Sequence, residues 1–154
     1  MFRDDYLMRM IEQLAGAIAR IAGLNRGGQH EEALAAADAA WGELLGDIPL
    51  GLAGAVDSRT LAGMLRRPDK IRLAAAILRE QAHALAGLGD PPGAARRSRR
   101  ALELLLEARA LAAEPGEPTG AGAEDAAAAL RELARSVPHD ALAARYQAML
   151  PADS

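Results

Sequence analysis

The scarcity of β-branched residues constrains the fold of this chain more than any other feature. Valine, isoleucine and threonine together make up ten of the 154 residues, whereas alanine alone makes up 38. Strands depend on β-branched and aromatic side chains to cover a pleated surface, and aromatic residues account for only 3% of the chain. Alanine is the strongest helix former. We therefore predict an all-α fold whose core is built from leucine, isoleucine and methionine, with alanine where helix backbones approach each other.

A first helix is predicted up to Gly27 by five apolar residues at helical spacing. They recur at alternating steps of four and three, which places them on one face of a helix. Gly27 and Gly28 follow, and glycine supplies the left-handed residue with which a helix often ends. The predicted buried face consists of Leu7, Ile11, Leu14, Ile18 and Ile21.

The next segments predict a helix, a connection and a short helix. The helix covers residues 30–45 and begins with two glutamates, which the helix dipole favours in a first turn. Residues 46–56 are rich in glycine and are interpreted as a connection. A short helix over 60–66 follows, capped by Asp57 or Ser58. The predicted buried face of the helix over 30–45 consists of Leu34, Ala37, Trp41, Leu44 and Leu45.

Two long helices and a C-terminal pair complete the predicted fold. One long helix runs from Pro68 to Gly87, and another follows a proline-rich turn and ends at Ala112. Residues 113–123 have no periodicity and consist mainly of proline, glycine and small residues, so they are predicted to form a flexible linker. The remaining residues, 124–154, are predicted to form a C-terminal helical hairpin.

Two segments share one pattern of leucine, glycine and small residues. Leu24 precedes Gly28 by four residues, and Leu85 precedes Gly89 by the same spacing, so each pair marks the end of a helix. Small residues then follow at identical spacings in the next helix, where they allow tight packing. They are Ala33, Ala37 and Ala40 in the first copy, and Ala94, Ser98 and Ala101 in the second.

This pattern resembles the tetratricopeptide helical hairpin. The two glycines lie 61 residues apart, which exceeds the ~34-residue period of a tandem array. The resemblance therefore implies stacked antiparallel hairpins within a domain of residues 1–112, interrupted by an inserted short helix at 57–67. The opening sequence FRDDYLMRMIEQLAGAIARI, together with both hairpins, also resembles a family of small uncharacterised bacterial proteins.

The tetratricopeptide resemblance also implies a binding function. Stacked hairpins form a concave groove that takes extended or helical peptides. Ligands of this family meet the first helix of each hairpin, and two arginines there would suit a carboxylate because guanidinium offers a planar fork of donors. We therefore expect a non-catalytic protein- or peptide-binding scaffold whose partner presents an acidic segment, such as its C-terminus. Carried over by the two glycines, the groove residues are Asn25, Arg26, Arg79 and His83.

His83 gives an alternative function. Its context, AHALAG, resembles the phosphoacceptor motif of histidine phosphotransfer domains, in which the histidine lies in the middle of a helix. Gly87 matches the glycine that leaves room for a receiver domain, whereas Ala86 stands where a lysine normally helps to hold the phosphoryl group. The alternative to a binding protein is therefore a histidine phosphotransfer protein acting through His83. The simpler interpretation is a histidine on a helix surface.

Four arginines form a basic face on the last long helix. They lie on the side opposite to its small residues, and the helix spacing allows Arg99 to pair with Glu103, and Arg100 to pair with Glu103 or Glu107. The simple interpretation is a solvated face, and the functional one is a docking patch for an acidic partner or nucleic acid. The face consists of Arg96, Arg97, Arg99 and Arg100.

Charge, cysteine content and motifs limit the remaining classes of function. The formal net charge of −3 opposes a dedicated nucleic-acid-binding protein, whose surface usually carries a basic excess. The chain has no cysteine, no signal-peptide segment and no apolar run near the ~18 residues of a membrane span, so we expect a cytoplasmic protein. The three histidines lack metal-ligand spacing, and no catalytic motif stands out. We expect no metal, no cofactor and no enzymatic activity.

Overall fold

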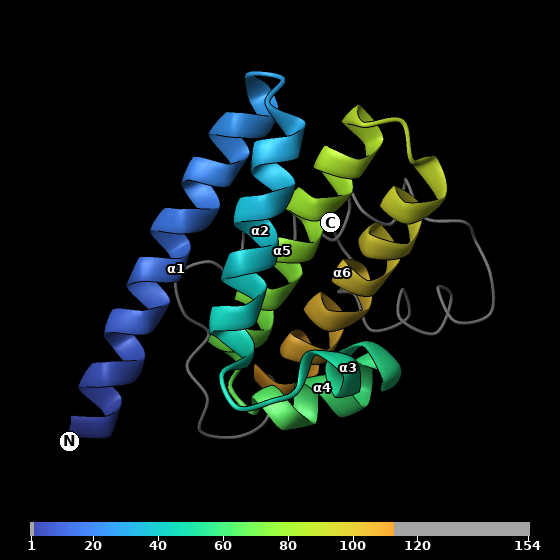
Figure 1. Cartoon of the computed structure of the whole chain (residues 1–154). Helices are drawn as coiled ribbons and strands as arrows, with labels where there is room; N and C mark the ends of the chain where they lie inside the picture. The colour runs from blue at the N-terminus through green and yellow to red at the C-terminus, as the bar shows by residue number, and fades with distance from the viewer. Residues whose placement is uncertain (1, 113–154) are drawn as a thin grey trace, which may run out of the picture.

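The computed structural model describes residues 2–112, and this part of the chain folds into α-helices without a strand (Figure 1). The all-α prediction is confirmed for these residues. The predicted linker at 113–123 and the predicted C-terminal hairpin at 124–154 lie outside the described residues. The helices are α1 (Phe2–Arg26), α2 (His30–Leu45), α3 (Leu50–Ala55), α4 (Ser58–Leu65), α5 (Pro68–Gly87) and α6 (Pro91–Ala112).

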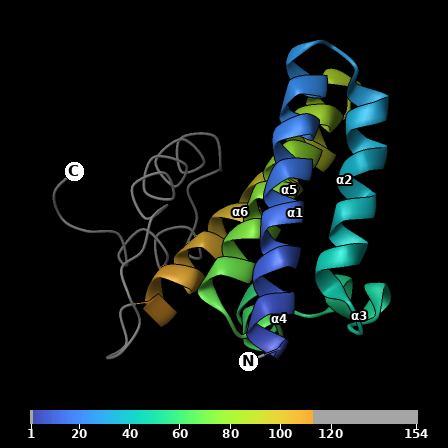
Figure 2. The ribbon, with the colours of Figure 1, turned by 90° about the vertical axis from the view of Figure 1, so that its left-hand side faces the viewer.

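The four long helices form two antiparallel pairs, α1 with α2 and α5 with α6 (Figures 1 and 2). Helix α5 packs against both helices of the first pair as well as against α6, so it is the central helix of the bundle. The short helices α3 and α4 lie at the end of the bundle where α2 ends and α5 begins, and α4 packs on α6. The insert between the two pairs therefore folds back over one end of α6.

The turns that follow α1 and α5 have the same hydrogen-bond pattern. At the end of α1, the Gln29 amide donates to the Leu24 carbonyl over 2.9 Å, and the Gly28 amide donates to the Asn25 carbonyl over 3.1 Å. The same pair of bonds recurs after α5 from Asp90 to Leu85 (2.9 Å) and from Gly89 to Ala86 (3.2 Å). This is the Schellman motif, which needs a left-handed residue. Gly28 and Gly89 supply it with φ angles of 79° and 83°.

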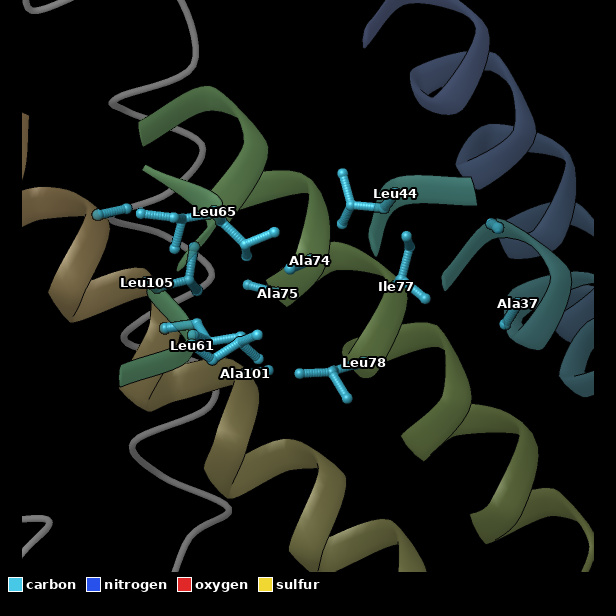
Figure 3. Packing of buried hydrophobic residues seen from close by; sticks show 14 of the residues in the cluster. Ala37, Leu44, Leu61, Leu65, Ala74, Ala75, Ile77, Leu78, Ala101 and Leu105 are labelled. Atoms are coloured by element: carbon cyan, nitrogen blue, oxygen red, sulfur yellow. The ribbon is translucent and has the colours of Figure 1, made fainter. Parts of the chain in front are cut away.

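The core consists of leucine, isoleucine and alanine, as predicted, whereas the methionine that was also predicted there contributes only the partly buried Met10. Ala74 and Ala75 of α5 are buried among larger side chains, so that neighbouring helices approach the central one closely (Figure 3). Figure 3 also shows Leu61 of α4 beside Ala101 and Leu105 of α6, which fixes the insert to the second pair.

The predicted faces of α1 and α2 are buried at some positions and partly exposed at others. Leu14 and Ile21 of α1 are buried, whereas Ile18 packs only at the edge of the core. On α2, Leu34 and Trp41 are only partly buried. The predicted Ala37, Leu44 and Leu45 are buried, and Ala33 and Ala40 complete the buried face of α2.

The connection predicted over 46–56 contains a short helix that the sequence analysis did not predict, α3. Two backbone carbonyls at the C-terminal end of α3, those of Ala53 and Val56, accept hydrogen bonds from Arg100 of α6 over 2.7 and 3.0 Å. Carbonyls at a helix end have no partner within the helix, so a cation there is stabilising. Two glycines in a six-residue helix weaken the local pattern, and the contact that supports it comes from a residue far along the chain.

Asp57 and Ser58, which the sequence offered as alternative caps for the short helix, have different roles. The Asp57 carboxylate accepts a hydrogen bond from the Thr60 amide over 2.7 Å and therefore caps α4. Ser58 is buried, and its hydroxyl donates to Oε1 of Glu103 over 2.7 Å. The cap thus begins α4, and the serine ties α4 to α6.

Candidate functional site

An open cavity of about 680 Å³ lies between α2, α3, α5 and α6. Its size falls within the range of small-ligand and peptide-side-chain pockets. Helix α6 contributes most of the charged lining, α5 contributes the buried Leu78 and Gln81, and α2 and α3 supply the remaining residues. The lining residues are Asp38, Trp41, Leu50, Ala53, Gly54, Leu78, Gln81, Arg96, Arg97, Arg99, Arg100 and Glu103.

All four arginines of the predicted basic face line this cavity. Arg96 is exposed, whereas the other three are partly buried. Nε of Arg99 lies 3.6 Å from Oε2 of Glu103, which is the ion pair expected from the helix spacing. The pairing of Arg100 with Glu103 or Glu107 is replaced by its two hydrogen bonds to the carbonyls of α3. The basic face therefore surrounds a hollow instead of lying on an open helix surface.

A buried glutamine holds Arg97 in place in the lining of the cavity. Nε of Arg97 donates to Oε1 of Gln81 over 3.2 Å, and Nε2 of Gln81 donates to Oδ1 of Asp38 over 2.9 Å. Gln81 is only 4% exposed, so its amide is fixed by these contacts and by packing. The chain of bonds from α2 through α5 to α6 orients one guanidinium toward the cavity, while the remaining Arg97 donors stay available.

The positive charge in the cavity is only partly neutralised. Four arginines face two carboxylates, those of Asp38 and Glu103. Among the described residues, neither Arg96, Arg97 nor Arg100 forms an ion pair with a carboxylate. Burial lowers the pKa of Arg100 below its ordinary value, and the charge of Arg97 acts in the same direction against an opposing effect of Glu103. An anion placed in the cavity would relieve this repulsion.

The predicted groove residues Asn25 and His83 come together on Glu80 of α5. Nδ2 of Asn25 donates to the Glu80 carbonyl over 3.0 Å and to its Oε1 over 2.9 Å, and Nδ1 of His83 lies 3.5 Å from the same oxygen. Oδ1 of Asn25 in turn accepts from Nδ1 of His30 over 3.0 Å. Asn25 therefore uses its amide to join α1, α2 and α5, and its bonding capacity is largely taken up inside the protein.

The other two predicted groove residues, Arg26 and Arg79, lie elsewhere on α1 and α5. Arg26 is exposed at the end of α1, and Arg79 is partly buried on α5. The network also contains a residue that sequence reasoning missed, Glu80. A carboxylate three residues after buried Ile77 and four before buried Ala84 is the signal that could have revealed it.

The environment of His83 does not favour a phosphoryl group on its ring. Its side chain is 48% exposed, but its Nδ1 faces the carboxylate of Glu80, which would repel an anion. A Cβ added to Gly87 would overlap the ring of His30, so this glycine makes room for a neighbouring helix of the same protein. The signal that suggested space for a receiver domain thus has a packing explanation.

Replacement of Glu80 by glutamine should destabilise the protein at neutral pH and have a much smaller effect in acid. Burial raises the pKa of Glu80, but hydrogen bonds from His83 and Asn25 outweigh it, and its pKa lies below the ordinary value. A carboxylate whose pKa is lowered by folding stabilises the folded protein at pH values above its pKa in the unfolded state. This contribution is lost as the pH falls through the pKa in the folded state. For Glu80→Gln we expect a loss of about 1–3 kcal/mol at pH 7.

Urea unfolding of the unsubstituted protein and of Glu80→Gln measures the loss of stability at each pH. The two pH values are 7 and about 3.5, the second of which lies below the reference pKa of about 4.3 for glutamate. Glu12→Gln, at an exposed position on α1, is the matched control and should show a small difference at both pH values. A Glu80→Gln effect of the same size at both pH values would contradict the role assigned to the carboxylate.

Within residues 2–112, no three histidine, aspartate or glutamate side chains come together in an arrangement that would hold a metal ion. No helix in this part of the chain combines the length and the apolar character needed to cross a membrane. The chain matches no protein-family model, no curated protein and no solved structure.

Proposed function

We propose that this protein is a non-catalytic binding protein that holds an acidic peptide segment of a partner in the arginine-lined cavity. The observation that carries the proposal is the excess of positive charge there: Arg96, Arg97 and Arg100 share one hollow and form no ion pair with a carboxylate of the described residues. Guanidinium groups bind carboxylates through paired, charge-assisted hydrogen bonds. A partner's acidic side chains would therefore replace the water that now solvates this charge.

The walls of the cavity favour a peptide over a free anion. Trp41 of α2 lines one side, and Leu50 of α3 lines another while remaining 63% exposed. An aromatic ring and an exposed leucine beside arginines resemble the apolar centre and charged rim of peptide interfaces. These surfaces would pack against the side chains that flank the acidic residue of the partner.

We further propose that the two helix pairs stack as tetratricopeptide hairpins do. The packing of α5 against both α1 and α2, and the shared Schellman turns at Gly28 and Gly89, support this arrangement. The ligand position differs from that of the family. The cavity lies along the second helix of each pair, α2 and α6, whereas the predicted groove lies on α1 and α5.

The cavity suits an acidic ligand better than the predicted groove does, because two polar side chains of the groove already have partners within the protein. Asn25 is occupied by Glu80 and His30, and the carboxylate of Glu80 would oppose an acidic ligand beside His83. On α5, Leu78 of the cavity and Glu80 of the network lie about 160° apart around the helix, so these two residues lie on different sides of α5.

Charge reversal in the cavity should weaken binding of acidic peptides. Trp41 is the only tryptophan and lines the cavity, so its fluorescence reports binding directly. The probes are an array of eight-residue peptides that combine leucine with glutamate or aspartate. For the peptide that binds best, Arg96→Glu and Arg97→Glu should each raise Kd at least about tenfold, which corresponds to about 1.4 kcal/mol.

Arg26→Glu and Arg79→Glu serve as controls because they reverse charges of the predicted groove, and they should leave Kd nearly unchanged. Thermal unfolding of each variant checks that the fold persists. A peptide whose binding depends on Arg26 or Arg79 and not on Arg96 or Arg97 would place the ligand on the α1–α5 side and contradict the proposed site. Absence of binding across the array would refute the binding of acidic segments.

A further inference from the structure

The charge balance of the cavity indicates what kind of acidic group it accepts. A single carboxylate brings one negative charge, whereas the four arginines exceed Asp38 and Glu103 by two positive charges. A phosphorylated side chain carries about −1.5 to −2 at pH 7 and three strong acceptor oxygens. We propose that the acidic group is the phosphoryl group of a phosphorylated peptide, an inference that rests on the peptide-binding function proposed above.

Two arginines offer donors for a phosphoryl group, and a third adds positive charge. Arg96 is exposed and makes no hydrogen bond within the described residues, so its whole guanidinium fork is available. Arg97 has committed only Nε, to Gln81, and keeps its terminal amino groups. Arg100 has committed Nη2 to the α3 carbonyls, and its positive charge remains without a carboxylate partner. The guanidinium groups of Arg96 and Arg97 can donate to the acceptor oxygens of a phosphoryl group, and the charge of Arg100 favours the same anion.

Glu103, which also lines the cavity, has both of its carboxylate oxygens bound to neighbouring side chains. Oε1 of Glu103 accepts a hydrogen bond from the buried Ser58, and Oε2 pairs with Arg99. Glu103 therefore forms its ion pair with Arg99, and no carboxylate of the described residues forms an ion pair with the other three arginines. Asp38 is similarly engaged by Gln81, whose other end orients Arg97. Both acidic residues of the lining are thus bound to neighbouring side chains, and the excess of positive charge in the cavity remains.

A peptide fits this site better than a nucleotide or nucleic acid does. The formal net charge of the chain is −3, which opposes long-range attraction of a polyanion. The apolar surface beside the arginines, formed by Trp41 and Leu50, matches the side chains that flank a phosphorylated residue. A base could also stack on Trp41, so a nucleotide is included as an outcome of the test.

The test compares a phosphoserine peptide, based on the best acidic peptide of the array, with the same peptide carrying glutamate, or serine, in place of phosphoserine. Trp41 fluorescence gives Kd for each, and for inorganic phosphate and adenosine monophosphate as small-anion probes. The phosphopeptide should bind at least about tenfold more tightly than the glutamate peptide, a gain of about 1.4 kcal/mol. The serine peptide and both small anions should bind more weakly than the phosphopeptide.

The pH dependence provides a second readout. The second ionisation of a phosphate has a pKa of about 6, so lowering the pH from 7.5 to 5.5 removes much of its second charge and should weaken phosphopeptide binding several-fold. The glutamate peptide should change little. The titratable lining residues described in the structure are arginines, aspartate and glutamate, and none of them is a histidine. The change therefore reports the ligand.

Arg96→Lys and Arg97→Lys test the geometry separately from the charge. Lysine keeps the cation but loses the planar fork, so both variants should reduce the preference for phosphopeptide over glutamate peptide. Equal affinity for the two peptides would refute the phosphoryl assignment and leave the proposed acidic-peptide function intact. Equal affinity for the phosphopeptide and adenosine monophosphate would refute the peptide assignment. Absence of binding by every probe would refute both proposals.

Discussion

Leu14→Ala should lower the free energy of unfolding by about 2–5 kcal/mol, the largest effect expected from a single substitution discussed for this protein. Leu14 lies on α1 and is fully buried, with 0% of its surface exposed, in the core that α1 shares with α2 and α5. The change removes buried methyl groups and leaves a cavity that rigid helix packing fills only in part. Equilibrium unfolding in urea, followed by far-UV circular dichroism, measures the loss.

Met8→Ala is the matched control, since it shortens a flexible side chain of the same helix at a position that is 48% exposed. Surface substitutions of this kind usually change stability by no more than about 0.5 kcal/mol. Similar values for Leu14→Ala and Met8→Ala would mean that α1 does not pack on the bundle through the Leu14 face. A large value for Leu14 alone would establish α1 as part of the cooperative core.

The long helices could be predicted from sequence because their signals are local. The helix predicted over 30–45 coincides with α2, and the helix from Pro68 to Gly87 coincides with α5. Gly28 marks the end of α1 because the Schellman turn there requires a left-handed residue, and this requirement lies within a few residues of the helix it ends. Periodicity and turn chemistry therefore predict both the helices and where they stop.

The missed features depend on contacts between residues that are far apart in the chain. The sequence does not predict helix α3, because the hydrogen bonds that stabilise its C-terminal end come from Arg100, more than forty residues later. The same contact explains why the arginine face was not recognised as a cavity lining. A run of arginines on one helix is indistinguishable from a solvated face until the fold brings residues of α2, α3 and α5 to the same cavity.

The predicted groove shows the limit of transferring positions from a family pattern. Asn25 and His83 do meet, but on Glu80, a residue that the pattern did not include. Hydrogen-bonding capacity decides whether a polar side chain is available to a ligand, and it depends on neighbours in space. Spacing in the sequence places a residue on a helix face and leaves its partners undetermined.

Gly87→Ala should destabilise the protein by about 1–3 kcal/mol, the order expected when an added methyl group forces neighbouring atoms to shift. The usual effect of this change in a helix is the opposite, a gain of about 0.5–1 kcal/mol, because alanine is the better helix former. Gly87 lies against α2, and a Cβ there would overlap the His30 ring. Movement of that ring would break its hydrogen bond to Asn25 and loosen the junction of three helices.

Removal of the histidine ring should reverse the sign of this effect. In a His30→Ala background the overlap is gone, so Gly87→Ala should stabilise the protein by about 0.5–1 kcal/mol. A double-mutant cycle from urea unfolding gives the coupling between the two positions. Gly63→Ala, at a helical glycine of α4 whose added Cβ would meet no atom, should be stabilising in both backgrounds. If Gly87→Ala behaves like Gly63→Ala in the protein that retains His30, the ring does not pack on Gly87, and the close approach of α2 to the end of α5 is refuted.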